Sequence, residues 1–210
     1  MKPILYTQRV EVIESYDERR DCADQRIVEF FYQCGFLPIA VPNYPSLIKE
    51  YVQLIQPIGL VLTGGNSLKK YGGNTAEKDM VDKMLISLAI EQDIPLLGFC
   101  RGMQSIFDYF NHELKNVENH IAVRHSIRFR NADTLEVNSY HQQGSYDVKK
   151  PLRKLAESED GIIEAVCHQN KKILGIMWHP EREDPFRITD INLVQKLFFK
   201  GEIAIKYGDE

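Results

Sequence analysis

Cys100 lies between two glycines in the stretch Gly98-Phe99-Cys100-Arg101-Gly102, where an apolar run ends and a helical pattern starts. A thiol at the start of a helix is close to unpaired backbone N–H groups and to the positive end of the helix dipole, and both favour a thiolate over a thiol. The glycines leave room for a sharply bent backbone and for close packing. This pattern predicts a nucleophilic cysteine. A buried structural cysteine with packing glycines is the alternative from these residues alone.

A cysteine nucleophile needs a base, and often a third group that orients the base. His179 is the best candidate, because it follows directly on a strand-like run that ends at Trp178. Glu181 can reach back to one imidazole nitrogen and fix its tautomer, and Pro180 stiffens the link. We therefore expect Glu181 to orient His179 and not to transfer the proton itself. His141 is the second candidate for the base.

Backbone N–H groups near Cys100 would complete the site by binding the oxyanion that forms at an attacked carbonyl. The stretch "VLTGGNSL" ends an apolar run with Gly64 and Gly65, whose N–H groups are open to a ligand, and the N–H of Arg101 starts the predicted helix. A simple turn is the alternative interpretation of two adjacent glycines. A phosphate loop is disfavoured, because the stretch lacks the G-x-x-x-x-G-K-[ST] pattern.

An alternation of strands and helices must position these residues. Short, mostly continuous apolar runs are typical of strands buried in a parallel sheet, and they occur at 4–7, 36–41, 58–62 and 94–99. Apolar residues at helical spacing occur at 27–34, 81–88 and 103–110, and a last helix is expected at about 189–199. From about 120 to 178 the strand-like stretches are 126–130, 134–137, 161–167 and 172–178, with polar turns between them.

This order of elements predicts an α/β fold, with an open, mixed, mainly parallel sheet and flanking helices. Ligands bind beyond the carboxyl ends of parallel strands, so Cys100, Gly65 and His179 are expected at one edge of the sheet. With 210 residues, we expect a single domain over 1–210.

Composition narrows the class of protein. A formal net charge of −4 argues against nonspecific binding of nucleic acid, and no apolar run is long enough to span a membrane. The N-terminal apolar run is too short for a signal peptide, so a soluble, cytoplasmic protein is expected. The four cysteines form no C-x-x-C pair, which disfavours disulfides and zinc ribbons. His112, His120 and His125 have no acidic residue at metal-ligand spacing, so no metal site is predicted.

Four stretches in fixed order, "LTGG", "GFCRGMQ", "VNSYHQQG" and "WHPE", resemble the class I glutamine amidotransferase family. They are most similar to its γ-glutamyl hydrolase (peptidase C26-like) branch, and the resemblance covers nearly the whole chain. It implies a flavodoxin-like sheet, no cofactor, and a catalytic triad of Cys100, His179 and Glu181. It also implies an oxyanion hole made by the N–H groups of Gly65 and Arg101.

The same resemblance implies a set of substrate contacts. Gly64 would lie against the substrate, Gln104 would contact the glutamyl group, and the backbone of Asn138-Ser139-Tyr140 would contact its α-amino and carboxylate ends. The sequence departs from the family at one point: members often carry an Arg-Asp pair before the helix that precedes the nucleophile, and here the pair is Lys78-Asp79. No role is assigned to it.

Residues 7–26 resemble members encoded in bacterial surface-polysaccharide loci, including hydrolases of γ-glutamyl-CDP-amidate, a nucleotide phosphoramidate. Arg9, Arg19 and Arg20 follow the first predicted strand, so they are candidates for phosphate contacts. The alternative is a solvated, net acidic face in which Asp17/Arg20 and Arg20/Asp24 pair on a helix surface.

The function expected from this sequence is hydrolysis of a γ-glutamyl amide through a Cys100 thioester, in a standalone enzyme acting on a small molecule. The alternatives are a glutaminase subunit that passes ammonia to a synthetase, a hydrolase of γ-glutamyl polyamines or γ-glutamyl-γ-aminobutyrate, and a binding module that has kept the fold. The last predicted helix lies near the end of the sequence, so no fused synthetase is expected. No partner chain is required, and a homodimer is left open.

Overall fold

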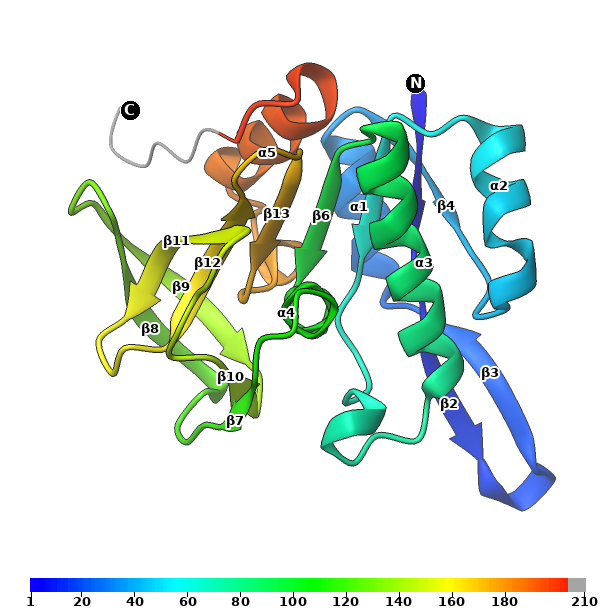
Figure 1. The fold of residues 1–210 in the computed structure, drawn as a ribbon, viewed down its shortest axis with the longest axis horizontal. Helices are drawn as coiled ribbons and strands as arrows, with labels where there is room; N and C mark the ends of the chain where they lie inside the picture. Colours follow the sequence, from blue (N-terminus) through cyan, green and yellow to red (C-terminus); the bar gives the residue numbers. More distant parts are fainter. Residues whose placement is uncertain (204–210) are drawn as a thin grey trace.

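A nine-stranded mixed sheet with helices on both faces makes up the computed structural model, which describes residues 1–203 (Figure 1). The strand order is β4-β1-β5-β6-β13-β12-β11-β8-β9. Five adjacent strands are parallel: β1 (Lys2–Tyr6), β4 (Phe36–Ala40), β5 (Gly59–Leu62), β6 (Leu96–Phe99) and β13 (Ile173–Ile176). Counted among themselves in chain order, they follow the 2-1-3-4-5 arrangement of flavodoxin-like sheets, which confirms the predicted fold class.

The other four strands extend the sheet in antiparallel order: β12 (Ile163–His168), β11 (Leu152–Ser158), β8 (Ile121–Phe129) and β9 (Thr134–Tyr140). β11 is missing from the predicted strands, because charged and polar residues interrupt its apolar pattern. Two short strands, β7 (Lys115–Asn116) and β10 (Gln143–Gly144), pair with each other beside the sheet.

Two layers of helices cover the sheet. The helices α2 (Ile48–Ile55), α3 (Ala76–Gln92) and α4 (Arg101–Tyr109) pack on one face, and α1 (Gln25–Gln33) and α5 (Ile188–Gln195) pack on the other. Each layer buries its own apolar cluster, such as Phe107 of α4 on the first face and Phe30 of α1 on the second. The predicted helices are confirmed. Within residues 1–203, no helix is both long enough and apolar enough to cross a bilayer.

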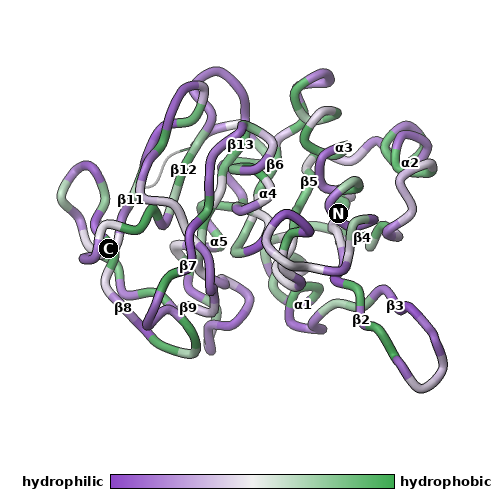
Figure 2. The backbone as a smooth tube through the Cα atoms, turned by 60° about the horizontal axis from the view of Figure 1, so that its bottom comes forward, coloured by the Kyte–Doolittle hydropathy of each residue, from purple (hydrophilic) through white to green (hydrophobic). Residues whose placement is uncertain are grey.

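A hairpin of β2 (Arg9–Ile13) and β3 (Glu18–Cys22) projects beyond the carboxyl ends of the parallel strands, and β3 is largely hydrophilic (Figures 1 and 2). The alternative of Asp17/Arg20 and Arg20/Asp24 pairs on a helix surface is therefore wrong. Arg20 instead pairs with Glu18, two residues earlier on the same strand, β3. The Asn66 side chain anchors the hairpin, since it accepts from the N–H of Val10 (2.8 Å) and donates to its carbonyl (2.7 Å).

Candidate active site

Cys100 occupies a sharp corner between β6 and α4, with φ +50° and ψ −112°, a conformation that L residues rarely adopt. Both flanking glycines are needed there. A Cβ on Gly102 would lie 2.0 Å from the carbonyl oxygen of Leu62, and a Cβ on Gly98 would lie 2.7 Å from that of Gly102. The predicted bent corner with packing glycines is confirmed, and the cost of its strained backbone points to a functional cysteine.

His179 follows β13, so it reaches the same edge of the sheet as Cys100, and both side chains are buried. A Cβ on Gly64 would lie 2.9 Å from His179 Cε1 and 3.7 Å from Cys100 Cβ, so both side chains flank this one glycine. His179 Nδ1 is 2.6 Å from Glu181 Oε1. The structure thus brings together the three residues of the predicted triad, with Glu181 in the orienting position.

The electrostatics of His179 favour its charged form. Burial alone would lower the pKa of its imidazole, but the charges of Cys100 and Glu181 and the hydrogen bond with Glu181 outweigh burial and raise it to about 10. The imidazole is therefore protonated at neutral pH and lies beside Cys100. A cationic imidazole next to a cysteine favours the thiolate, which is the nucleophilic form.

In wild-type protein we expect the His179 imidazole to titrate near pH 10, and in Cys100→Ala we expect its pKa to fall, because the opposing effect of burial stays. The folded pKa of His179 exceeds the ordinary value of 6.5, so the stabilisation contributed by its charged imidazole is complete below about pH 6.5 and is lost as pH rises toward 10. Proton NMR titration of the histidine ring signals measures the pKa of His179 in the wild-type protein and in Cys100→Ala. His168, whose pKa burial and Lys171 lower, should titrate alike in both proteins. An unchanged His179 titration in Cys100→Ala would contradict an effect of Cys100 on this imidazole.

Asn138 has a role that the sequence analysis missed. Its side chain accepts from the N–H of His179 (2.9 Å) and donates to the carbonyl of His179 (2.9 Å), so it clamps the backbone of the candidate base. The same amide donates to Glu183. The Ser139 hydroxyl also forms a hydrogen bond within the protein, because it donates to the carbonyl of His120. Backbone contacts from this segment to a substrate stay a prediction.

Gly65 and Arg101, the predicted oxyanion donors, line one cavity together with Cys100. Gly65 has φ +131°, and a Cβ there would lie 2.5 Å from Cβ of Arg9, so the position requires glycine. Arg101 is the first residue of α4, where a backbone N–H has no acceptor within the helix. The oxyanion hole itself stays a proposal.

The side chain of Arg101 enters a buried network of charges. It forms ion pairs with Asp79 and Asp82, and its Nε donates to the carbonyl of Asn66. Lys78 Nζ lies 3.5 Å from Asp82 Oδ1 and donates to Thr7 Oγ1 (3.1 Å). Burial lowers the pKa of Arg101 to about 10, although Asp79 acts in the opposite direction. The Lys78-Asp79 pair, to which no role was assigned, thus helps to hold the residue that follows the nucleophile.

Two cavities meet at Cys100. The inner pocket, of about 140 Å³, is lined by Cys100, Gln104, Tyr140, His141 and Gln143, among others. Gln104 Nε2 donates to the carbonyl of Gln143 (3.0 Å), which fixes its amide at the pocket wall. His141 lies in this pocket wall, whereas His179 lies beside Cys100, where a base would have to be.

The outer cavity, of about 560 Å³, is more open and lies between β2 and the triad. Its lining includes Arg9 and Arg182, and the guanidinium of Arg182 lies 4.3 Å from the ring centre of Tyr140. Arg182 was missed by the sequence analysis, although it directly follows Glu181. Arg19 and Arg20 are absent from the lining of this cavity. They pair with Glu77 and Glu18, so only one of the three predicted arginines reaches it.

A cysteine at a strand-to-helix corner of a 2-1-3-4-5 sheet, with a buried His-Glu pair from the neighbouring parallel strand, defines a cysteine-dependent hydrolase on an α/β scaffold. The chain belongs to the Peptidase C26 family, whose profile matches residues 4–108 and 107–181. It is therefore an enzyme of the hydrolase class, in a family whose typical nucleophile is cysteine.

Several known proteins are similar to this chain. Gamma-glutamyl-CDP-amidate hydrolase of Campylobacter jejuni is 34% identical over 197 residues, which cover 91% of this chain and 95% of that protein. Gamma-glutamyl-gamma-aminobutyrate hydrolase of Escherichia coli O157:H7 is 29% identical over 75% of this chain and 77% of its own length. The crystal structure of a glutamine amidotransferase from Thermotoga maritima has a TM-score of 0.65 at 18% identity, covers 93% of this chain and 82% of that one, and supports the fold.

Proposed function

We propose that this chain hydrolyses the γ-glutamyl amide bond of a small molecule, and that the leaving group carries phosphate. The observation that carries the proposal is the buried Cys100–His179–Glu181 arrangement at the junction of a small inner pocket and a larger, arginine-lined cavity. The similarity to two named γ-glutamyl hydrolases over three quarters or more of the chain supports the reaction class.

The proposed reaction has two halves. The Cys100 thiolate attacks the γ-carbonyl carbon, and the N–H groups of Gly65 and Arg101 stabilise the oxyanion. The C–N bond then breaks while the His179 imidazolium gives its proton to the leaving nitrogen, which leaves a thioester and a neutral imidazole. In the second half, His179 takes a proton from water, the resulting hydroxide adds to the thioester, and glutamate leaves as the thiolate–imidazolium pair re-forms. Glu181 holds the imidazole in position throughout.

The two cavities suggest how the substrate lies. The glutamyl group would occupy the inner pocket beside Gln104, and the leaving group would occupy the outer cavity. There Arg9 and Arg182 present cationic groups suited to phosphate oxygens. The similarity to the Campylobacter jejuni hydrolase supports a nucleotide phosphoramidate such as γ-glutamyl-CDP-amidate. A cytoplasmic location and a homodimer stay predictions.

A panel of γ-glutamyl compounds tests this function with the purified chain alone. We expect the highest kcat/KM for a γ-glutamyl nucleotide phosphoramidate, a lower value for γ-glutamyl-γ-aminobutyrate, and the lowest for glutamine. Release of glutamate is measured by a coupled assay. Steady turnover of glutamine with no activity on any larger adduct would overturn the proposal in favour of a glutaminase.

Arg9→Met and Arg182→Ala should each raise KM for the nucleotide-linked substrate by about tenfold with little change in kcat, because the lost contact binds substrate and transition state alike. Methionine keeps most of the apolar stem that packs on Gly65. γ-Glutamyl-p-nitroanilide, which has no phosphate, should respond much less. Arg20→Ala is the matched control, because Arg20 is exposed, pairs with Glu18, and should leave both substrates unaffected. Equal losses on both substrates would mean that Arg9 and Arg182 act on the fold.

A further inference from the structure

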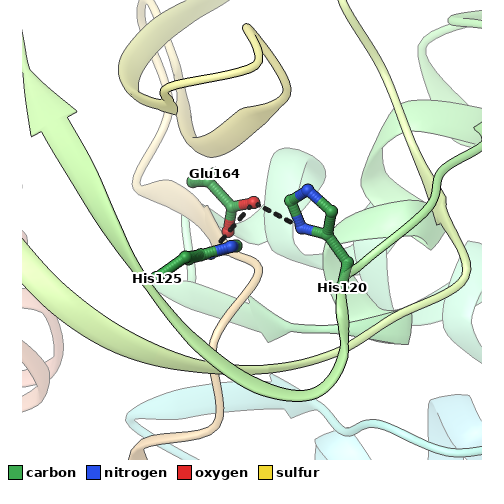
Figure 3. Close-up of side chains that lie close together, drawn as sticks. All are labelled: His120, His125 and Glu164. Atoms are coloured by element: carbon green, nitrogen blue, oxygen red, sulfur yellow. Dashed lines mark ion pairs between the residues drawn. The ribbon is translucent and has the colours of Figure 1, made fainter.

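Three histidines and a glutamate converge behind the inner pocket. His120 and His125 come from the start of the β8 region, and both point toward Glu164 of β12 (Figure 3). One donor atom from each of these three residues lies within 4.8 Å of the others. His141, just after β9, adds its Nε2 at 3.4 Å from Glu164 Oε1 and 3.2 Å from His120 Nδ1. His120, His141 and Glu164 are buried, and His125 is partly buried.

The hydrogen bonds at the outer side of the cluster fix two tautomers. His120 Nε2 lies 3.0 Å from an Asp160 carboxylate oxygen, and His141 Nδ1 lies 3.2 Å from the carbonyl of Gln143. Both partners are acceptors, so both nitrogens carry hydrogen. When the rings are neutral, the inner nitrogens of His120 and His141 therefore present lone pairs to each other at 3.2 Å. A positive charge must lie between them.

The inner side of the cluster has the donors and spacing of a metal site. Among residues 1–203, neither oxygen of Glu164 nor Nε2 of His125 finds a hydrogen-bond partner. Four donor–donor distances, three to Glu164 and one between His120 and His141, run from 3.2 to 3.6 Å. A tetrahedral zinc ion with ligands at 2.0–2.1 Å separates neighbouring donors by about 3.3 Å. The outer partners of His120 and His141 are of the kinds that orient metal-binding imidazoles.

We propose that His120, His125 and Glu164 bind a zinc ion, with His141 as the fourth ligand. Four protein ligands leave no open position, so the ion has a structural role. It ties the start of β8, the end of β9 and β12 together. It also fixes His141, whose Nδ1 donates to the carbonyl of Gln143. The same carbonyl accepts from Gln104 in the wall of the inner pocket, so the ion also helps to hold Gln104. The sequence hides the site, because Glu164 is distant from the histidines along the chain.

Metal titration tests the site, and Cys100→Ala is the parent protein, so that the catalytic thiol cannot bind zinc. Chelator-treated protein is titrated with Zn²⁺ against a chromogenic indicator, and with Co²⁺ for its visible spectrum. We expect one equivalent of Zn²⁺ with a Kd below about 1 μM. The Co²⁺ spectrum should show the strong visible bands of a tetrahedral site without a sulfur-to-cobalt charge-transfer band. Such a band would place the ion on Cys22 or another thiol and overturn the proposal.

Ligand variants complete the test. His125→Ala and Glu164→Gln should each weaken Zn²⁺ binding at least about 100-fold, because even outer partners of metal ligands contribute 10–100-fold. Glu164→Gln keeps the shape of the side chain, so it serves if His125→Ala does not fold. His168→Ala, which removes a histidine outside the cluster, should bind as the parent does. Saturating Zn²⁺ should raise the Tm of the parent and not that of Glu164→Gln. Binding weaker than about 100 μM in the parent, or unchanged binding in both ligand variants, would show that a proton alone holds the cluster.

Discussion

Replacing Cys100 with alanine should lower kcat by about 10⁴-fold or more, because loss of a nucleophile removes the covalent step and not merely a contact. The folded state should keep its stability to within about 1 kcal/mol, since the change removes one small sulfur atom and keeps the Cβ at the strained corner. Glutamate release from a γ-glutamyl adduct and urea denaturation measure the two effects. A variant that unfolds, or that keeps a tenth of the activity, contradicts the role proposed for Cys100.

The other cysteines are built-in controls. Burial, with a further contribution from Asp190, raises the pKa of Cys34, and burial raises the pKa of Cys167, so neither thiol is reactive at neutral pH. Cys22 lies near the site, where it accepts a hydrogen bond from Arg9 Nε (3.4 Å). Cys22→Ala should keep kcat for γ-glutamyl-p-nitroanilide. Iodoacetamide should inactivate the enzyme by labelling Cys100, and inactivation through label on Cys34 or Cys167 would count against the assignment.

Asp82→Asn should destabilise the fold by about 3–5 kcal/mol, the usual cost of breaking a buried ion pair from one side. Asp82 is fully buried, forms an ion pair with Arg101, accepts from Ser105 Oγ (2.8 Å) and faces Lys78. The amide keeps the volume but removes the charge, so the buried Arg101 loses its ion pair with Asp82 and keeps the one with Asp79. Urea denaturation monitored by fluorescence measures the loss.

The same substitution should lower activity in the protein that remains folded, because Arg101 follows the nucleophile and supplies a proposed oxyanion donor. Asp93→Asn is the matched control. Asp93 pairs with Lys172 on the surface at 2.6 Å, and about half of its side chain is exposed, so removing its charge should leave the stability almost unchanged. Similar losses of stability in Asp82→Asn and Asp93→Asn would mean that the buried ion pair of Asp82 stabilises the fold no more than an exposed ion pair does.

The sequence by itself determined the parallel half of the sheet, the helices α1, α3, α4 and α5, and the residues of the proposed triad, while α2 was not predicted. These follow from local signals. Apolar runs of strand length and helical spacing decide where elements form, and glycines around Cys100 mark a corner that other residues cannot occupy. His179 and Glu181 are two residues apart, so their contact needs no tertiary information. Because parallel strands align their carboxyl ends, the meeting of Cys100 with His179 also follows from topology alone.

Only the tertiary structure decided which charged and polar side chains reach the site. The segment after β1 folds into a hairpin, and pairing across the chain turns Arg19 toward Glu77 while Arg9 enters the outer cavity. Asn138 meets the backbone of His179, and Glu164 meets His120, across strands far apart in sequence. Charged side chains have many equivalent partners along an exposed segment. Which partner a charged side chain pairs with depends on which oppositely charged groups the packed fold brings within a few ångströms. That distance cannot be predicted from the local sequence.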